Sequence, residues 1–525
     1  MRTVGERLVE GLAARGVKVV FGIPGVHTVE LYRGLSESPV RHVTARHEQG
    51  CAFMADGYAR ASGQPGVAFV ITGPGITNAL TAMAQSRQDS VPVLVISGVN
   101  RRDSLGRGLG RLHELPDQAA MVRALCPTRQ ITAPEDVGPV LDWAWALLTT
   151  GRPGPVHIEV PTDVMPLPCP PLAPPAALAE QPVPGADALA RAAELLNRAA
   201  RPVILVGGGA RGQQAALQAL AEKLDAPVIQ TTNARGMMHG HPLTVPASPS
   251  LAVVRDLITG ADQVLAIGTE LGQTDYDMYA DGGLPDLSSM IRIDRDGAQL
   301  GRWTTALALL GDAGATMAAL LPLLTPHAAQ GAPRAEDTRH RARAVLGELS
   351  PTMPGQLDMV EAIRAALPGC QIIGDSTQPI YAGNLYYDHD RPGGWFNAAT
   401  GYGALGFGPG AAVGAAMARP DLKTVCLVGD GGLQFSPGEL RTAVDERLPI
   451  TFLVWNNAAF REIAEAMRGA NTEVIGCHPS PLRLEPFAAA CDLPFTSVPQ
   501  DPDVLHWALS QPQDGPRLIE IRVTL

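Results

Sequence analysis

One stretch of the chain, residues 425–457, constrains the fold more than any other. It begins with a short apolar run at 425–428, Val-Cys-Leu-Val, which predicts a buried strand. Gly-Asp-Gly-Gly follows at 429–432, and a helix is expected next, with Ser436 as its N-cap. A second apolar run at 450–455 predicts another strand. Strand, helix and strand in this order predict a right-handed parallel crossover.

The two predicted strands bring polar residues together. In a parallel crossover both strands end at the same edge of the sheet, so Asp430 and Asn457 are expected to lie close to each other there. A carboxylate, a carboxamide oxygen and a backbone carbonyl just beyond Asn457 are ligands that suit Mg²⁺, which takes its remaining ligands from phosphate and water. Gly431 and Gly432 leave room for a diphosphate at the helix start. The alternative to a metal and diphosphate site is a turn at the end of a strand, with an unrelated asparagine pair.

Composition excludes several other classes of protein. The net charge of −11 and the absence of a basic cluster argue against a nucleic-acid partner. Seven scattered cysteines without a Cys-x-x-Cys pair are typical of buried thiols in a reducing compartment, not of a disulfide framework or a zinc site. The N-terminus has no apolar signal sequence and no run reaches membrane-spanning length, so a cytoplasmic location is expected.

A chain of 525 residues is too long for one core, and its strands and helices alternate. The proline-rich segment 166–184 predicts one linker, and residues 324–337 predict a second. We therefore expect an α/β protein of three doubly wound or Rossmann-like parallel-sheet domains, at residues 1–168, 185–325 and 345–525. In the central domain, Gly-Gly-Gly-Ala-Arg-Gly at 207–212 matches a dinucleotide-binding turn. No acid follows the next strand to bind a ribose, so a structural turn is favoured.

These motifs carry a family resemblance. Gly-Asp-Gly at 429–431 with Asn-Asn at 456–457 resembles the thiamine-diphosphate signature, and Arg-His-Glu-Gln at 46–49 extends the likeness. The whole chain resembles the superfamily of pyruvate decarboxylases and acetolactate synthases. The strings at 22–27, 112–118 and 274–277 are most similar to 5-guanidino-2-oxopentanoate (2-ketoarginine) decarboxylases. The resemblance implies a pyrimidine-binding, a central and a diphosphate-binding domain.

The resemblance also implies where thiamine diphosphate and Mg²⁺ are held. Glu48 would hydrogen-bond the aminopyrimidine ring and promote proton removal from the thiazolium, so that the cofactor carbon attacks a 2-oxo acid and the cofactor accepts electrons as CO₂ leaves. Without the resemblance, Glu48 would be a first-turn helix carboxylate that interacts with the helix dipole. The other implied cofactor residues are Gly403 through its carbonyl, Leu405 as the prop of the bent cofactor, Ser376, Thr377, Gly429, Asp430, Gly431, Gly432 and Asn457. The implied metal ligands are Asp430, Asn457 and the carbonyl of Ala459.

Three further residues are candidates for substrate binding. His27 and His113 are expected to handle protons, because release of an aldehyde requires protonation of the carbon that CO₂ left. Glu462 is expected to pair with a cationic substrate group such as guanidinium. The alternatives are satisfied histidines and a solvated helix residue.

Several activities remain open from the sequence. The favoured one is non-oxidative decarboxylation of a 2-oxo acid to an aldehyde and CO₂, and its near rival is a carboligase or lyase like acetolactate synthase or benzaldehyde lyase. A nicotinamide-binding oxidoreductase built on the 207–212 turn and a binding-only homologue are the rivals from other classes. FAD is doubtful, because Glu270 to Asp275 replace the Arg-Phe-Asp-Asp string of acetolactate synthases. The resemblance implies a homodimer or homotetramer with active sites between subunits.

Overall fold

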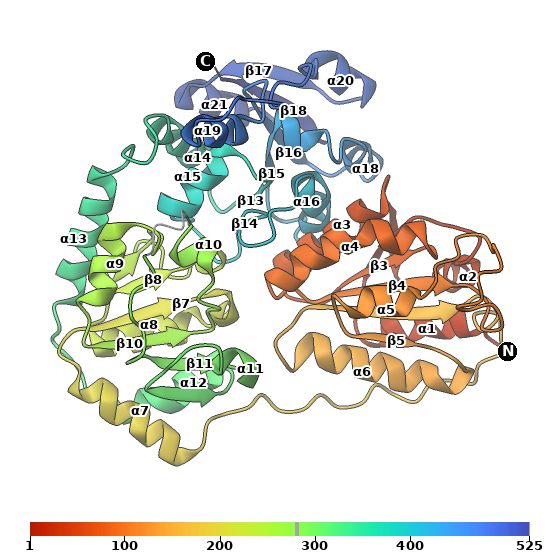
Figure 1. Ribbon diagram of the computed structural model, residues 1–525, viewed down its shortest axis with the longest axis horizontal. Helices are drawn as coiled ribbons and strands as arrows, with labels where there is room; N and C mark the ends of the chain where they lie inside the picture. The colour runs from red at the N-terminus through yellow and green to blue at the C-terminus, as the bar shows by residue number, and fades with distance from the viewer. Residues whose placement is uncertain (279–282, 524–525) are drawn as a thin grey trace.

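The computed structural model describes residues 1–278 and 283–523, and within them three parallel sheets each contain six strands (Figure 1). Every described strand pair within these sheets is parallel, so the α/β fold of three parallel-sheet domains expected from the sequence is confirmed. None of the described helices combines the length and apolar character needed to cross a membrane.

The N-terminal sheet has the strand order β2-β1-β3-β4-β6-β5. Its first helix begins at a capped residue, where Thr3 and Glu6 form a reciprocal capping box. Its strands are β1 Val19–Gly22, β2 Arg41–Thr44, β3 Gly66–Val70, β4 Val93–Val99, β5 Thr128–Gln130 and β6 Pro155–Pro161. Its helices are α1 Val4–Ala14, α2 Val29–Ser36, α3 Glu48–Ser62, α4 Pro74–Gln88, α5 Gln118–Arg123, η1 Pro134–Asp136 and α6 Val137–Thr149.

The central sheet has the order β12-β11-β10-β7-β8-β9, which is the order of a dinucleotide-binding Rossmann sheet. Its strands are β7 Pro202–Val206, β8 Val228–Gln230, β9 Thr244–Val245, β10 Gln263–Ile267, β11 Ile291–Asp294 and β12 Leu307–Leu310. Its helices are α7 Ala186–Arg198, η2 Gly208–Ala210, α8 Gln214–Leu224, η3 Thr232–Ala234, α9 Ala252–Thr259, α10 Gln273–Tyr276, α11 Gly297–Leu300, α12 Ala313–Leu320 and η4 Leu321–Leu323. The irregular segment before α7 crosses from the N-terminal to the central sheet, as the proline content predicts (Figure 1).

The C-terminal sheet, ordered β14-β13-β15-β16-β18-β17, repeats the topology of the N-terminal sheet strand for strand. Its strands are β13 Gln371–Gly374, β14 Trp395–Asn397, β15 Thr424–Gly429, β16 Ile450–Asn456, β17 Phe495–Pro499 and β18 Arg517–Arg522. Its helices are α14 Met353–Ala366, α15 Gln378–Tyr386, α16 Phe407–Ala418, α17 Asp430–Leu433, α18 Glu439–Asp445, α19 Arg461–Gly469, α20 Leu484–Ala490 and α21 Pro502–Leu509.

Two local predictions were wrong, the first of them in part. The expected linker at 324–337 is irregular only up to residue 330: its second half belongs to α13, Gly331–Ala344, which packs Ala335 and Ala342 into the core shared by the central and C-terminal sheets. Ser436 does not cap a helix: its hydroxyl donates to the carbonyl of Gly406 at 2.7 Å, and Gly438 precedes α18 instead. In both places a tertiary contact outweighs the local signal.

The N-terminal and C-terminal sheets share one hydrophobic core, in which α3 packs on α16. The two helix backbones approach closely at glycines: a Cβ at Gly57 would lie 2.0 Å from the Ala411 carbonyl oxygen, and one at Gly414 would lie 1.9 Å from that of Met54. This contact joins the two domains of one chain through a common core.

Candidate active site

The carboxyl edge of the N-terminal sheet gathers three of the residues predicted from the sequence. His27 follows β1, Glu48 follows β2, and His113 lies in the segment after β4. These strands are neighbours in the parallel order β2-β1-β3-β4, so their following segments share one edge. Sheet topology therefore brings Glu48 and the two histidines to the same end of the domain.

Glu48 is the first residue of α3, and its carboxylate is held from one side. Asn78 Nδ2 donates to Glu48 Oε2 at 3.0 Å, while the helix start is capped by the His47 ring, which accepts from the Gln49 N–H at 3.2 Å. The backbone before the helix is anchored by Glu439 of α18, which accepts from the N–H groups of Arg46 and His47. Glu48 Oε1 has no hydrogen-bond partner within the described residues, so it is free to bind a ligand.

His27 and His113 lie against each other. Their ring centroids are 5.5 Å apart at an interplanar angle of 83°. Burial, and then the neighbouring His113, hold the pKa of His27 below its ordinary value. His27 Nδ1 is buried without a hydrogen-bond partner in the described chain, and His113 has φ +59°, a left-handed conformation that costs energy for a non-glycine residue. The two rings are therefore adjacent, and His113 is held in a strained backbone conformation.

Gln118, a residue that was not predicted from the sequence, hydrogen-bonds the two glycines against which His113 and His27 pack. Its Oε1 accepts from the N–H of Gly73 at 3.0 Å, and its Nε2 donates to the carbonyl of Gly98 at 2.9 Å. A Cβ at Gly73 would lie 2.4 Å from the His113 carbonyl oxygen, and one at Gly98 would lie 3.2 Å from His27 Cβ. The two histidines thus pack on glycines that one buried glutamine ties together.

His157, beneath this network, yields a pH-dependence prediction. Its Nε2 lies 2.8 Å from Ser97 Oγ, and full burial lowers its pKa to about 3 from 6.5. Below pH 6.5 the unfolded chain binds a proton that the folded chain refuses until about pH 3, so stability falls with falling pH by about 1.4 kcal/mol per pH unit. We expect the melting temperature of His157→Gln to fall less steeply than that of wild type between pH 6 and pH 4.5.

Comparing how steeply the two melting temperatures depend on pH separates the contribution of His157 from those of other titrating groups. Burial raises the pKa values of Asp275 and Asp375 to about 6, which acts in the opposite direction in this pH range, but both aspartates are present in each protein. The constant cost of the substitution shifts the whole melting curve and not its slope. Parallel pH profiles for the two proteins would contradict the assignment of a neutral buried His157.

The second group of predicted residues lies at the carboxyl edge of the C-terminal sheet. Asp430 begins α17 directly after β15, and Asn457 follows the neighbouring strand β16. The Asn457 N–H donates to Asp430 Oδ1 at 3.4 Å, and both residues are buried, 6% and 8% exposed. The parallel crossover predicted for 425–457 is confirmed, and it brings these two side chains together.

The surroundings of Asp430 fit a divalent cation. Burial raises the pKa of this carboxyl, the nearby Glu520 raises it further, and no Lys, Arg or His forms an ion pair with it in the described part of the chain. A buried carboxylate without a cationic partner is costly unless a cation binds. Ala459 lies beside Asn457 and donates its N–H to Asn457 Oδ1 at 3.2 Å. Hard oxygen donors of this kind match the ligands that Mg²⁺ takes.

Gln378, also missed from the sequence, orients the amide of Asn457. Its Oε1 accepts from Asn457 Nδ2 and from the Trp455 indole N–H, each at 3.1 Å. Because the amide nitrogen of Asn457 is engaged there, its oxygen faces away from Gln378. Glu462 lies near Gln378, and burial raises the pKa of its carboxyl, although the residue is exposed in the single chain. The predicted substrate residue Glu462 therefore lies beside the predicted metal residues.

The predicted glycines and hydroxyl residues occupy the same edge. A Cβ at Gly431 would lie 2.6 Å from the Phe460 ring. The space beside this glycine is therefore filled by that ring and is not open. A Cβ at Gly432 would lie 3.2 Å from Asp375 Oδ1, and one at Gly429 would lie 3.0 Å from Thr377 Oγ1. Ser376 donates its N–H to Asp375, and Thr377 is 7% exposed. Ser376 and Thr377 follow β13, Gly429 ends β15, and Gly431 and Gly432 follow β15, which is adjacent to β13.

Gly403 and Leu405 lie in the turn that precedes α16. Gly403 has φ +74° and is exposed, and Leu405 is half-buried, so both are accessible to a ligand. Gly406, with φ +82°, ends the turn, where Asp375 accepts from the N–H of Gly408 at 2.9 Å. The turn is thus held at its α16 end by the buried carboxylate of Asp375.

A cavity of about 990 Å³ lies where the three domains meet. The glycine-rich turn at 207–212 contributes to its wall, together with residues around Asp89 and Arg391. Close packing also requires these glycines, since a Cβ at Gly207 would lie 2.4 Å from the Gly268 carbonyl oxygen. Glu48, Asp430 and Asn457 are not among the residues that line this cavity.

Comparison with known proteins gives one consistent family. Residues 2–121 match the thiamine pyrophosphate enzyme N-terminal TPP binding domain, residues 189–320 match the central domain, and residues 375–521 match the C-terminal TPP binding domain. Each matched region contains most of the strands of one of the three sheets.

Individual relatives agree with the domain matches. The chain is 42% identical, over 99% of its length and 94% of the relative, to "Probable 2-ketoarginine decarboxylase AruI" of Pseudomonas aeruginosa. It is 30% identical, over 99% of its length and 94% of the relative, to the acetolactate synthase isozyme 1 large subunit of Escherichia coli K12. The chain therefore belongs to the thiamine pyrophosphate enzymes, in their group of 2-oxo acid decarboxylases and acetolactate synthases.

Proposed function

We propose that this enzyme decarboxylates a 2-oxo acid without oxidation, with thiamine diphosphate and Mg²⁺, and that its substrate carries a cationic side chain, as 5-guanidino-2-oxopentanoate does. The observation that carries the proposal is the 42% identity, along nearly the whole chain, to a relative named as a probable 2-ketoarginine decarboxylase. The exposed carboxylate of Glu462, near Gln378, which itself accepts from Asn457, supports the choice of a cationic substrate.

The residues of both sheet edges fit the cofactor. Asp430, Asn457 and the Ala459 carbonyl would hold Mg²⁺, with Gly429, Gly431, Gly432, Ser376 and Thr377 near the diphosphate. Glu48 would hydrogen-bond the pyrimidine through the oxygen that Asn78 leaves free, with the Gly403 carbonyl and Leu405 against the same group. When bound, thiamine diphosphate supplies the nucleophilic carbon and takes up the electron pair that CO₂ leaves.

The histidine pair supplies the protons. Because the pKa of His27 lies below its ordinary value, His27 is neutral at pH 7 and can pass a proton to or from its neighbour His113. In the proposed reaction, a proton taken up from solvent passes through this pair to the carbon that CO₂ left, so that the decarboxylated substrate can leave as an aldehyde.

We propose an assembly of at least two chains, with each active site between the N-terminal domain of one chain and the C-terminal domain of its partner. The two sheet edges of a single chain each supply half of the expected contacts. A homodimer or a homotetramer would meet this requirement. We also propose a reducing compartment such as the cytoplasm, because the seven cysteines are buried and none of them forms a disulfide.

Product analysis separates decarboxylation from its near rival. Purified protein with Mg²⁺ and thiamine diphosphate should convert 5-guanidino-2-oxopentanoate to CO₂ and the corresponding aldehyde. Pyruvate given alone should yield little acetolactate or acetoin. Acetolactate or acetoin as the main product would instead establish a carboligase, whereas failure to act on any 2-oxo acid would reject the proposal.

Substitution of Glu462 tests the substrate class. We expect Glu462→Gln to lower kcat/KM for 5-guanidino-2-oxopentanoate about tenfold, the loss of one charge-assisted hydrogen bond, and to leave 2-oxohexanoate nearly unaffected. Glu465→Gln is the matched control, because Glu465 lies one turn further along α19 and pairs with Arg461 at 2.9 Å. An equal loss for the two substrates would argue against pairing between Glu462 and the guanidinium.

A further inference from the structure

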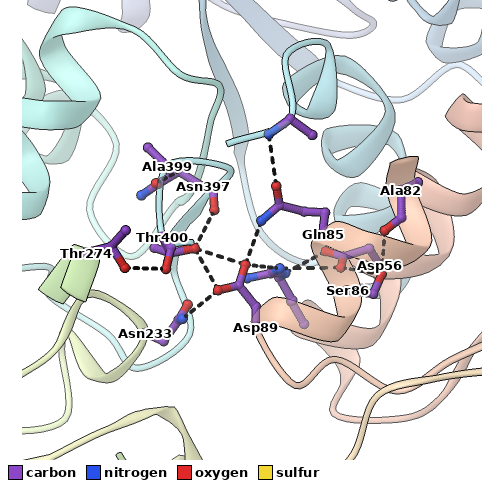
Figure 2. A network of polar contacts seen from close by, with 12 residues as sticks. Asp56, Ala82, Gln85, Ser86, Asp89, Asn233, Thr274, Asn397, Ala399 and Thr400 are labelled. Carbon is purple, nitrogen blue, oxygen red and sulfur yellow. Dashed lines mark hydrogen bonds and ion pairs between the residues drawn. The ribbon is translucent and has the colours of Figure 1, made fainter. Parts of the chain in front are cut away.

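A buried polar network joins the C-terminal end of α4 to the turn that carries Gly403 and Leu405. Figure 2 shows Gln85 and Asp89 between Asp56 of α3 on one side and Thr400 on the other. The network includes residues of all three domains, since Asn233 and Thr274 of the central domain also contact it. Nothing in the local sequence indicates this arrangement.

Asp89 is the centre of the network. Its Oδ2 accepts from Arg60 Nη2, from Gln85 Nε2, each at 2.8 Å, and from Thr400 Oγ1 at 2.9 Å. Arg60 is in turn paired with Asp56 at 2.5 Å, and the side chains of Arg60 and Asp89 are only 1% and 2% exposed. Buried ion pairs of this kind add little net stability, but they define positions because each broken contact leaves an uncompensated charge.

The turn at 397–404 is attached to this centre at two points. Thr400 Oγ1 donates to Asp89, and the Thr400 carbonyl accepts from Thr274 Oγ1 at 2.8 Å. The N–H of Ala404 donates to Gln85 Oε1 at 3.1 Å, and Gln85 is completely buried. Gly403, which lies between these two attachments, donates its own N–H to the carbonyl of Ala398 at 3.1 Å.

The consequence concerns the two residues beside Ala404. Gly403 and Leu405 are its direct neighbours, and the proposed function gives the Gly403 carbonyl and the Leu405 side chain to the cofactor. We infer that Gln85 is a positioning residue: it fixes the 403–405 turn through the Ala404 N–H, and Asp89 fixes Gln85. The expected effect on cofactor binding rests on the proposed function. The expected effect on the 403–405 turn does not, and it can be measured in the protein without cofactor.

Gln85→Leu tests the inference, with Gln88→Leu as the matched control. Gln88 is exposed on the same helix, and its amide forms no hydrogen bond within the described residues; leucine keeps the stem that lies against Gly401. In the cofactor-free protein we expect hydrogen exchange of the Ala404 amide to accelerate at least about tenfold in Gln85→Leu and not in Gln88→Leu. We also expect the Kd for thiamine diphosphate to rise about tenfold and kcat to fall, with the KM for the 2-oxo acid unchanged.

A second pair of variants covers the case in which Gln85→Leu does not fold. Thr400→Val removes the hydroxyl that donates a hydrogen bond to Asp89, whereas Thr400→Ser retains it. Only the valine variant should therefore weaken cofactor binding and accelerate amide hydrogen exchange in residues 400–405. Equal cofactor affinity and exchange in Gln85→Leu and Gln88→Leu, or in the two Thr400 variants, would overturn the inference. Wild-type protein that binds no thiamine diphosphate would instead overturn the proposed function, and the exchange result would still decide the role of Gln85 in the turn.

Discussion

Glu48→Gln is expected to lower turnover of the 2-oxo acid about 10³-fold while the protein still folds and binds thiamine diphosphate. The amide keeps the size of the side chain and its contact with Asn78, which is at 3.0 Å in wild type, but it no longer offers a carboxyl group to the pyrimidine ring. Loss of a positioned acid or base costs catalysis about 10²-fold to 10⁴-fold. The measurement is steady-state kcat together with a titration of cofactor binding.

The control addresses the alternative role of a first-turn carboxylate. Glu6 lies in the first turn of α1, in a capping box with Thr3, and is far from the predicted site in the sequence. Glu6→Gln should leave kcat unchanged and cost about 1 kcal/mol of stability or less. If Glu48→Gln behaved in the same way, Glu48 would be only a helix-terminal acid and the proposed mechanism would fail.

Asp430→Asn is expected to raise the Mg²⁺ concentration needed for cofactor binding about 100-fold, because it removes the charge that faces the metal. Wild-type protein should gain about 2.7 kcal/mol of stability when the ligand is present at 100 times its Kd, and the variant should gain almost none at the same concentration. Thermal unfolding with and without Mg²⁺ and thiamine diphosphate measures both quantities.

The melting temperature of Asp430→Asn without cofactor gives a second test. Burial raises the pKa of Asp430, so the charged carboxylate destabilises the folded chain at neutral pH, and Asp430→Asn should melt at the same temperature as wild type or higher without ligand. Asp421→Asn is the matched control at the opposite end of β15, where Asp421 is exposed and pairs with Arg419 at 2.7 Å. A cofactor response in Asp430→Asn equal to that of Asp421→Asn would remove Asp430 from the metal site.

Much of the fold was predictable because its signals are local. Short apolar runs separated by glycines, as at 67–73 and 425–432, predict strands that end in turns, and alternation with helices predicts parallel sheets. The two failures have one cause: α13 and Ser436 are placed by contacts with distant residues, which outweigh weak local preferences. Local patterns report on local structure only.

The supporting residues of the site were not predictable for the same reason. Gln85, Gln118 and Gln378 are ordinary glutamines in the sequence, yet each is buried and joins segments that are far apart. Gln85 contacts Ala404 across 319 positions, Gln378 contacts Asn457 across 79, and Gln118 contacts Gly73 across 45. No periodicity or short motif records a hydrogen bond over such separations.

The sequence by itself determined the alternation of strands with helices, the family, and the carboxylate and amide that follow β15 and β16, because these properties depend on short segments. Only the tertiary structure decided that Asn78 leaves one oxygen of Glu48 free, that His27 faces His113, and that α4 supports the Gly403 turn. The physical reason is that the parallel register and the packing of α3 on α16 set which distant side chains meet, and burial then determines their hydrogen bonds and their charge.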